Sequence, residues 1–267
     1  REFFRPSRGW GLLLLLTSCE KVIDINLNNA AKKYVIEGII TNEPGFCKVQ
    51  ITQTVNFSEA NTFPWVSGAI VTVTDNNNSP ITLVETVAGT YQTSAINGTT
   101  GHAYRLSVNI NGEVFSATSQ MPAEVKFDSL FVEDFIGFGD IVKYANVVFK
   151  DPPGKGNAYR FKQYKNGLTN KTIFVINDDF SDGRINTVLL PDFANDNDDD
   201  KIKSGDTVKV DMQCIDARVY KYWFSLSQSG TGGNNNASPA NPLSNITGGA
   251  LGYFSAHTVQ TKSVVVQ

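Results

Sequence analysis

The chain has 267 residues, of which 18% are charged and 41% hydrophobic, and its formal net charge is −3 at pH 7. This composition supplies enough apolar side chains for packed cores and excludes wholesale disorder. The sequence has no block of Lys and Arg, which argues against a nucleic-acid partner because phosphate contacts need such clusters.

Residues 1–18 have the parts of a secretory signal peptide, which needs a basic start, an apolar run and small residues at its end. Arg1, Arg5 and Arg8 are basic, and residues 10–16 are apolar. The apolar run is too short to span a bilayer, which takes about 20 residues. We therefore predict export from the cytoplasm.

Residues 16–19, Leu-Thr-Ser-Cys, resemble the lipobox of bacterial lipoproteins, in which an apolar and two small residues precede a cysteine. The resemblance implies cleavage before Cys19 and a covalent diacylglycerol and N-acyl lipid on that residue. Two or more acyl chains hold a protein stably on a membrane. The alternative is a buried Leu-rich segment that ends in cysteine. Residues 19–33 are then predicted to be a lipidated tether.

Residues 34–122 consist of short apolar segments separated by turns, and we predict an immunoglobulin-like β-sandwich here. Residues 47–52 alternate apolar and polar side chains, as a half-buried strand requires. Asn111 and Gly112 fit a tight hairpin turn in which both central residues have positive φ. About seven strands with turns every ~8–12 residues are typical of such a sandwich.

Residues 123–267 are predicted to form a second β domain, either a sandwich or a barrel-like sheet. Met121 and Pro122 mark the boundary, because proline cannot donate to a strand ladder. One helix is predicted near residues 217–228, with Asp216 as its N-cap. Its apolar side chains share one face and are expected to pack in a core: Val219, Tyr222, Trp223 and Leu226.

Two cysteines remain besides Cys19, namely Cys47 and Cys214. An exported location permits a disulfide. The two residues lie far apart in the sequence and in different predicted domains, so two buried free thiols are the favoured alternative.

Residues 238–256, which include Asn245, Gly248 and Gly249, are similar to the C-terminal signature of a Bacteroidetes lipoprotein family known as domain of unknown function 4249. Residues 19–24 and 35–38 and the Asn111, Met121 and Pro122 positions resemble the same family. The resemblance implies an outer-membrane lipoprotein with two β domains, often encoded near TonB-dependent transporters. It implies no known reaction and no catalytic residues.

Asn245, Tyr253 and Phe254 within this signature are candidate ligand or partner contacts. The alternative is a structural lock of the loop onto the domain. Tyr253 and Phe254 are expected to point to opposite faces of a strand, and Gly252 would let another backbone approach closely. Trp65, in a predicted loop of the first domain, is a further candidate contact, because loop aromatics often bind partners. The alternative for Trp65 is closure of one end of the sandwich.

No metal site is predicted. The nearest candidates for calcium are Asp196, Asp198 and Asp200, but Lys201 stands where an EF-hand loop has its turn glycine, and a solvated acidic loop is the alternative. The two histidines, His102 and His257, are isolated, which excludes a His-rich zinc site. Each is expected to be an ordinary surface or turn residue.

We expect no enzyme, because the sequence has neither a P-loop nor a Gly-x-Ser-x-Gly elbow. The expected function is that of a non-catalytic binding or docking accessory, and the family resemblance implies a TonB-dependent transporter as its partner. The expected location is the outer membrane, through the Cys19 lipid, with the periplasmic or cell-surface face left open. One alternative is a secreted hydrolase that uses Asp178, Asp182 and Asp211. Another is a purely structural or adhesion protein of the envelope.

Overall fold

The computed structural model describes residues 31–56, 59–76, 78–137, 140–191, 201–230 and 241–267. The protein is mainly β with a single helix in this described part, which confirms the predicted fold class. The elements are β1 (Tyr34–Thr41), β2 (Cys47–Gln53), β3 (Ile70–Asp75), β4 (Ile81–Thr82), β5 (Val84–Val87), β6 (Thr90–Thr93), β7 (Ala103–Ile110), β8 (Glu113–Gln120), β9 (Phe127–Gly137), β10 (Asp140–Lys150), β11 (Ala158–Lys165), β12 (Leu168–Thr169), β13 (Phe174–Asn177), β14 (Ile185–Leu190), β15 (Thr207–Ile215), α1 (Ala217–Gly230), β16 (Ile246–Thr247) and β17 (Leu251–Val265).

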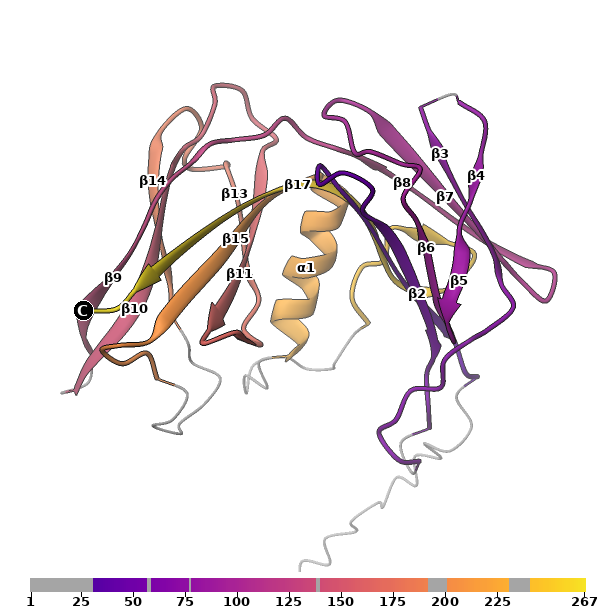
Figure 1. The fold of residues 1–267 in the computed structure, drawn as a ribbon, viewed down its shortest axis with the longest axis horizontal. Helices are drawn as coiled ribbons and strands as arrows, with labels where there is room; N and C mark the ends of the chain where they lie inside the picture. The colour runs from indigo at the N-terminus through magenta and orange to yellow at the C-terminus, as the bar shows by residue number, and fades with distance from the viewer. Residues whose placement is uncertain (1–30, 57–58, 77, 138–139, 192–200, 231–240) are drawn as a thin grey trace, which may run out of the picture.

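The strands form three sheets that make two sandwiches (Figure 1). A nine-stranded sheet has the order β12-β11-β15-β17-β1-β2-β6-β5, with β13 paired to β11. One end of it faces the five-stranded sheet β16-β8-β7-β3-β4 across the first hydrophobic core, and the other end faces the three-stranded sheet β14-β10-β9 across the second core. Of the two predicted forms of the second domain, the described strands therefore adopt the sandwich.

Strand β17 belongs to both sandwiches. Its first half pairs in parallel with β1, from Val35 opposite Leu251 to Thr41 opposite His257. Its second half pairs antiparallel with β15, from Cys214 opposite Thr258 onward. Because β17 is hydrogen-bonded to one strand of each sandwich, the two sandwiches share a continuous sheet and are joined by more than a linker.

This sharing differs from the predicted division at residue 122. Ile246, Ala250 and Phe254 pack in the first core, although the sequence analysis placed them in the second domain. The parallel pairing of β1 with β17 joins residues at opposite ends of the chain, and such a long-range register leaves no local signal in the sequence.

Side-chain bonds hold β17 where its pairing changes. The Asn42 side chain, just after β1, accepts a hydrogen bond from the Val259 amide at 2.8 Å. The Gln260 side chain donates to the Val125 carbonyl at 2.6 Å and accepts from the Phe127 amide at 3.0 Å. These bonds satisfy backbone groups that have no strand partner at the junction.

Helix α1 begins as predicted. The Asp216 carboxylate accepts hydrogen bonds from the amides of Arg218 and Val219, at 2.8 and 3.0 Å, which is the geometry of an N-cap. Ser119, a buried residue at the end of β8, donates its hydroxyl to the same carboxylate and accepts from the Ala256 amide at 2.9 Å. The N-cap thus links the helix to the first sandwich and to β17.

Cys47 and Cys214 are both free and buried, which confirms the favoured alternative of two unpaired thiols. Cys47 lies in the first core and Cys214 in the second. Asn111 and Gly112 connect β7 to β8 with φ values of 51° and 92°, as the predicted hairpin turn requires. Within the described ranges, no helix combines the length and apolarity needed to cross a bilayer.

Candidate functional site on the helix-side face

The face of the nine-stranded sheet that points away from both cores carries a group of charged and aromatic side chains that contact one another. We call it the helix-side face, because α1 lies against it between the two sandwiches (Figure 1). Ala158 of β11, Ile215 of β15 and Tyr253 of β17 pack there against Tyr222 and Trp223 of α1. Because side chains alternate along a strand, every second residue of β11, β15 and β17, counted from Ala158, Ile215 and Tyr253, lies on the same face.

The strand registers define rows across this face. Glu37 of β1 lies opposite Tyr253 of β17 and Gln50 of β2. Arg160 of β11 lies opposite Gln213 of β15. A longer row crosses the first sandwich and ends on β17: Val84, Gln92, Lys48, Ile39 and Ser255. The face therefore combines residues from both sandwiches.

Arg160 is held beneath the helix. Its guanidinium carbon lies 3.5 Å from the centre of the Trp223 ring, and its Nη1 donates to Oε1 of Gln213 at 3.1 Å. Tyr253 packs beside the helix residues, with its ring centre 4.9 Å from those of Tyr222 and Trp223. Burial lowers the pKa of Arg160, and the nearby tyrosines oppose that shift. The stacked ring and the single bond hold the guanidinium plane in a defined orientation.

Glu37 lies among cations on the same face. Glu37 is exposed to solvent on β1 by its surface area. The surrounding groups nevertheless desolvate its carboxyl, which raises its pKa, while the charges of Lys48 and Arg160 act against that increase. Beyond Arg160 along β11, Tyr164 donates its hydroxyl to the Asp211 carboxylate at 2.9 Å, and the Lys209 ammonium lies 3.9 Å from the Tyr164 ring centre. The charges of this end of the face are thus partly matched.

His257 lies at the middle of β17 and is almost completely buried, with 4% of its surface exposed. Its Nδ1 is 2.8 Å from the Ser255 hydroxyl. Burial lowers the pKa of His257 to about 3, and the neighbouring charge of Arg160 acts in the same direction. The expectation that both histidines are surface or turn residues is therefore wrong for His257. Strand alternation places its ring on the same helix-side face as Tyr253, but β17 lies in the interior of the nine-stranded sheet, and the surrounding side chains bury the ring.

A pH titration tests this burial. The unfolded chain has an ordinary His257 pKa of 6.5, whereas the folded chain has a pKa of about 3, so stability is full above pH 6.5 and falls as the pH drops toward 3. The expected loss from His257 alone is about 2 kcal/mol at pH 5. Urea unfolding at pH 7, 6 and 5 should show this dependence in the wild type and in His102→Gln, and a flatter one in His257→Gln. Equal slopes for all three proteins would contradict the assignment.

The structure separates the three candidates of the C-terminal signature. The Asn245 amide donates to the Phe254 carbonyl at 2.7 Å and its oxygen accepts from the Phe254 amide at 2.9 Å. The Phe254 side chain is fully buried in the first core, so it cannot meet a ligand, and the structural-lock alternative describes these two residues. Tyr253 points to the opposite face, as expected, and belongs to the helix-side face.

Trp65 lies beside β2, where it forms an isolated bridge with Thr52 and packs over Gly89. Trp65 is 52% exposed, and Phe63, two residues earlier, is 48% exposed. Trp65 is thus a surface residue that remains a candidate partner contact, at a different place from the helix-side face.

Cys19 and the calcium candidates Asp196, Asp198 and Asp200 lie outside the described residues. The carboxylates that the described structure does bring together are Asp151, Asp178 and Asp182, whose oxygens lie within 4.8 Å of one another.

Backbone amides occupy much of this carboxylate group. The amides of Gly156 and Asn157 donate to Asp178 at 3.1 and 2.9 Å, and those of Gly183 and Gly154 donate to Asp151 and Asp182 at 3.0 and 2.7 Å. The group has the donor set of a hard cation such as Ca²⁺. The amide bonds also account for it as a device that orders two loops.

The hydrolase candidates are not all brought together. Asp178 and Asp182 lie in this carboxylate group, whereas Asp211 lies on β15. There its carboxylate accepts from the Tyr164 hydroxyl and, at 2.8 Å, from the Thr261 hydroxyl.

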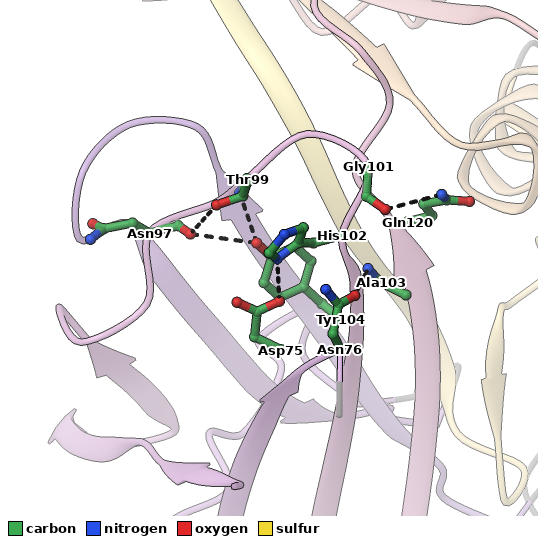
Figure 2. A network of polar contacts seen from close by, with 9 residues as sticks. All are labelled: Asp75, Asn76, Asn97, Thr99, Gly101, His102, Ala103, Tyr104 and Gln120. Atoms are coloured by element: carbon green, nitrogen blue, oxygen red, sulfur yellow. Dashed lines mark hydrogen bonds and ion pairs between the residues drawn. The ribbon is translucent and has the colours of Figure 1, made fainter. Parts of the chain in front are cut away.

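A second polar network lies around the 97–102 loop of the first sandwich (Figure 2). Nδ1 of His102 lies 2.8 Å from the Asp75 carboxylate, and the Tyr104 hydroxyl accepts from the Thr99 amide at 2.8 Å. The Gln120 side chain donates to the Gly101 carbonyl at 3.2 Å. These three contacts each join a loop to a strand end, and the Thr99 hydroxyl also donates to the Asn97 carbonyl within the loop at 3.4 Å. The network therefore positions the 97–102 loop, and His102 is a partly exposed turn residue, as expected.

The sequence analysis did not select Arg160, Lys162, Glu37 or Lys48. Polar residues at alternate positions of a strand are ordinary for an exposed face, so their spacing carried no functional signal. Only the pairing of β17 with both β1 and β15 places them on one surface.

These features define a class: a mainly β protein in which two sandwiches share a strand and enclose a polar, aromatic face beside one helix. A comparison with family models matches residues 20–263 to the family described as Domain of unknown function (DUF4249), and the chain belongs to that family. This membership confirms the resemblance drawn from the C-terminal signature. A comparison with curated proteins finds no match.

Proposed function

We propose that this protein is a lipid-anchored accessory of the outer membrane that binds or docks a partner without catalysing a reaction, and that the partner is a TonB-dependent transporter. The observation that carries the binding role is the sharing of β17, because it fixes two sandwiches around one polar surface. A surface built from both halves of a molecule suits the holding of a ligand or partner in one geometry. The lipobox at Cys19 and the family membership support the location and the partner.

The hydrolase alternative has less support. Asp178 and Asp182 accept bonds from loop amides, and Asp211, which is bonded to Tyr164 and Thr261, does not belong to the same carboxylate group. A purely structural role would not require the group of charged and aromatic side chains beside α1.

Membrane fractionation and affinity purification test the proposal. A tagged chain is expressed in its native host, cross-linked in intact cells, solubilised in mild detergent and purified, and the retained proteins are identified by mass spectrometry. A TonB-dependent transporter is expected with the wild type. The Cys19→Ala variant should lose the lipid and leave the outer-membrane fraction, and its transporter yield should fall at least about tenfold, since acyl-chain burial supplies the anchoring energy. A wild type that retains no transporter would contradict the docking role.

A further inference from the structure

Three cations of the helix-side face have no carboxylate partner among the described residues. Ion pairs of 4.0 Å or less are formed elsewhere in the described structure by Lys32, Lys126, Lys143 and His102, and on this face by Lys209. Arg160, Lys162 and Lys48 form none within the described residues. Each of the three unpaired residues is only partly exposed. Partly buried cations are normally paired or in contact with a counter-ion, because desolvation makes an isolated charge costly.

The three cations form one group. Arg160 and Lys162 occupy successive positions of β11 on the same face, and Lys48 lies on β2 in the other sandwich. Burial lowers the pKa of Lys162, and repulsion from Arg160, Lys209 and Lys48 lowers it further, while Asp211, opposite Lys162 on β15, acts against the shift. Charges that repel one another in this way concentrate positive potential at one place on the surface.

Arg160 is prepared for a planar anion. A guanidinium has five N–H donors, and the described structure assigns one of them, from Nη1 to Gln213. The Trp223 ring covers one face of the guanidinium at 3.5 Å and leaves the donors at its edge. An edge of two parallel N–H groups matches the two oxygens of a carboxylate or phosphate.

The same face is hollowed beside Lys48. A pocket of about 410 Å³ is lined by Lys48, Gln92, Val84 and Thr86, together with the turn that precedes β2. Val84, Gln92 and Lys48 are three successive members of the row that continues through Ile39 to Ser255. Space for the body of a ligand thus lies beside Lys48.

We propose that Arg160, Lys162 and Lys48 form a binding subsite for the oxyanion of a small ligand, a carboxylate or a phosphate, and that the pocket beside Lys48 holds the rest of that ligand. Glu37, between Lys48 and Arg160, is the acceptor for a hydroxyl next to the oxyanion. A hydroxylated organic acid or a sugar phosphate has this combination of groups. The inference deepens the proposed function and rests on it, since it names the ligand class of the surface that carries the binding role.

An NMR titration tests the subsite. The indole N–H signal of Trp223 in the isotope-labelled chain, assigned with Trp223→Phe, is followed while D-glucuronate, inorganic phosphate or D-glucose is added at constant ionic strength. Saturable shifts are expected with glucuronate or phosphate, with a Kd in the millimolar range, that is, about −4 kcal/mol. Saturation by glucuronate alone assigns a carboxylate, and saturation by phosphate alone assigns a phosphate. Glucose should give none.

Charge-matched variants locate the binding. Lys162→Gln and Lys48→Gln should each weaken it at least about fivefold, and Arg160→Gln at least about tenfold, because each change removes a charge-assisted hydrogen bond to the oxyanion. Lys126→Gln removes the same charge from a side chain that is 84% exposed and paired with Asp128, and should bind as the wild type does. No hydrogen bond or ion pair within 4.0 Å is seen for the side chains of Lys48 and Lys162 among the described residues, so both variants should fold, which the spectrum itself verifies.

Two results would overturn the subsite. One is the absence of a saturable shift with both anions at concentrations up to about 50 mM, ten or more times the expected Kd. The other is binding by Lys162→Gln and Lys48→Gln that equals that of Lys126→Gln. Failure of the transporter purification would leave these titrations unaffected, so the two proposals can fail separately.

Discussion

Replacing Gly252 by alanine is expected to lower the free energy of unfolding by at least about 4 kcal/mol, enough to prevent folding in a domain of ordinary stability. The reason is the close approach of β17 to β1. A Cβ at Gly252 would lie 2.1 Å from the Ile36 carbonyl oxygen and 2.9 Å from the Ile36 nitrogen, and the glycine has a φ of +96°. Both contacts are with backbone, so relief would require the two parallel strands to separate.

Gly249→Ala is the matched control. Gly249 has a similar φ of +89°, but a Cβ there would meet nothing within 4 Å. It should cost only the strain of a side chain at positive φ, about 1–2 kcal/mol. Urea unfolding of the two variants therefore separates the steric effect from the backbone effect. Equal losses in both would show that strand contact at Gly252 contributes nothing.

Replacing Asn245 by alanine should lower the free energy of unfolding by about 2–4 kcal/mol. The side-chain amide of Asn245 makes two bonds to the backbone of Phe254, at 2.7 and 2.9 Å, on the edge of β17 that β1 does not occupy. Each backbone group left unsatisfied costs roughly 1–3 kcal/mol. The Phe254 ring is fully buried in the first core, so disorder at this position would spread into the core.

Asn186→Ala provides the comparison for this change. The Asn186 amide makes one local, solvent-exposed bond, to the Arg184 carbonyl at 3.2 Å, from a partly exposed position. Its removal should cost about 0.5 kcal/mol. The test is the difference in urea midpoints between the two variants measured together. A loss for Asn245→Ala no larger than that for Asn186→Ala would mean that the two bonds to Phe254 do not lock the strand.

Local patterns predicted several features that the structure contains. The alternation of Val208, Val210, Met212 and Cys214 predicted β15, and the spacing of Val219, Tyr222 and Trp223 predicted α1 with its Asp216 cap. The Asn111 turn and the opposite directions of Tyr253 and Phe254 followed from the same kind of reasoning. Each of these depends on neighbours within a few residues, where chain geometry alone sets the outcome.

The candidate site could not be predicted in this way. Arg160 and Glu37 are separated by more than a hundred residues, and each reads as an ordinary polar position of a strand. They share a surface because β17 pairs with β1 on one side and β15 on the other. The burial of His257 could not be predicted from local sequence either, since it depends on the strands that surround the middle of β17, as its lowered pKa depends on that burial and on the nearby charge of Arg160.

Periodicity, capping and composition act over short distances, so they were enough to predict the β-rich class, the one helix of the described residues, the two unpaired buried thiols and the family signature. Three features depend on tertiary packing instead: the last strand serves both sandwiches, Asn245 locks Phe254, and Arg160, Lys162 and Lys48 share one face. The physical reason is that the register between strands far apart in the chain is selected by the packing of two whole cores, and no local stretch of residues contains that choice.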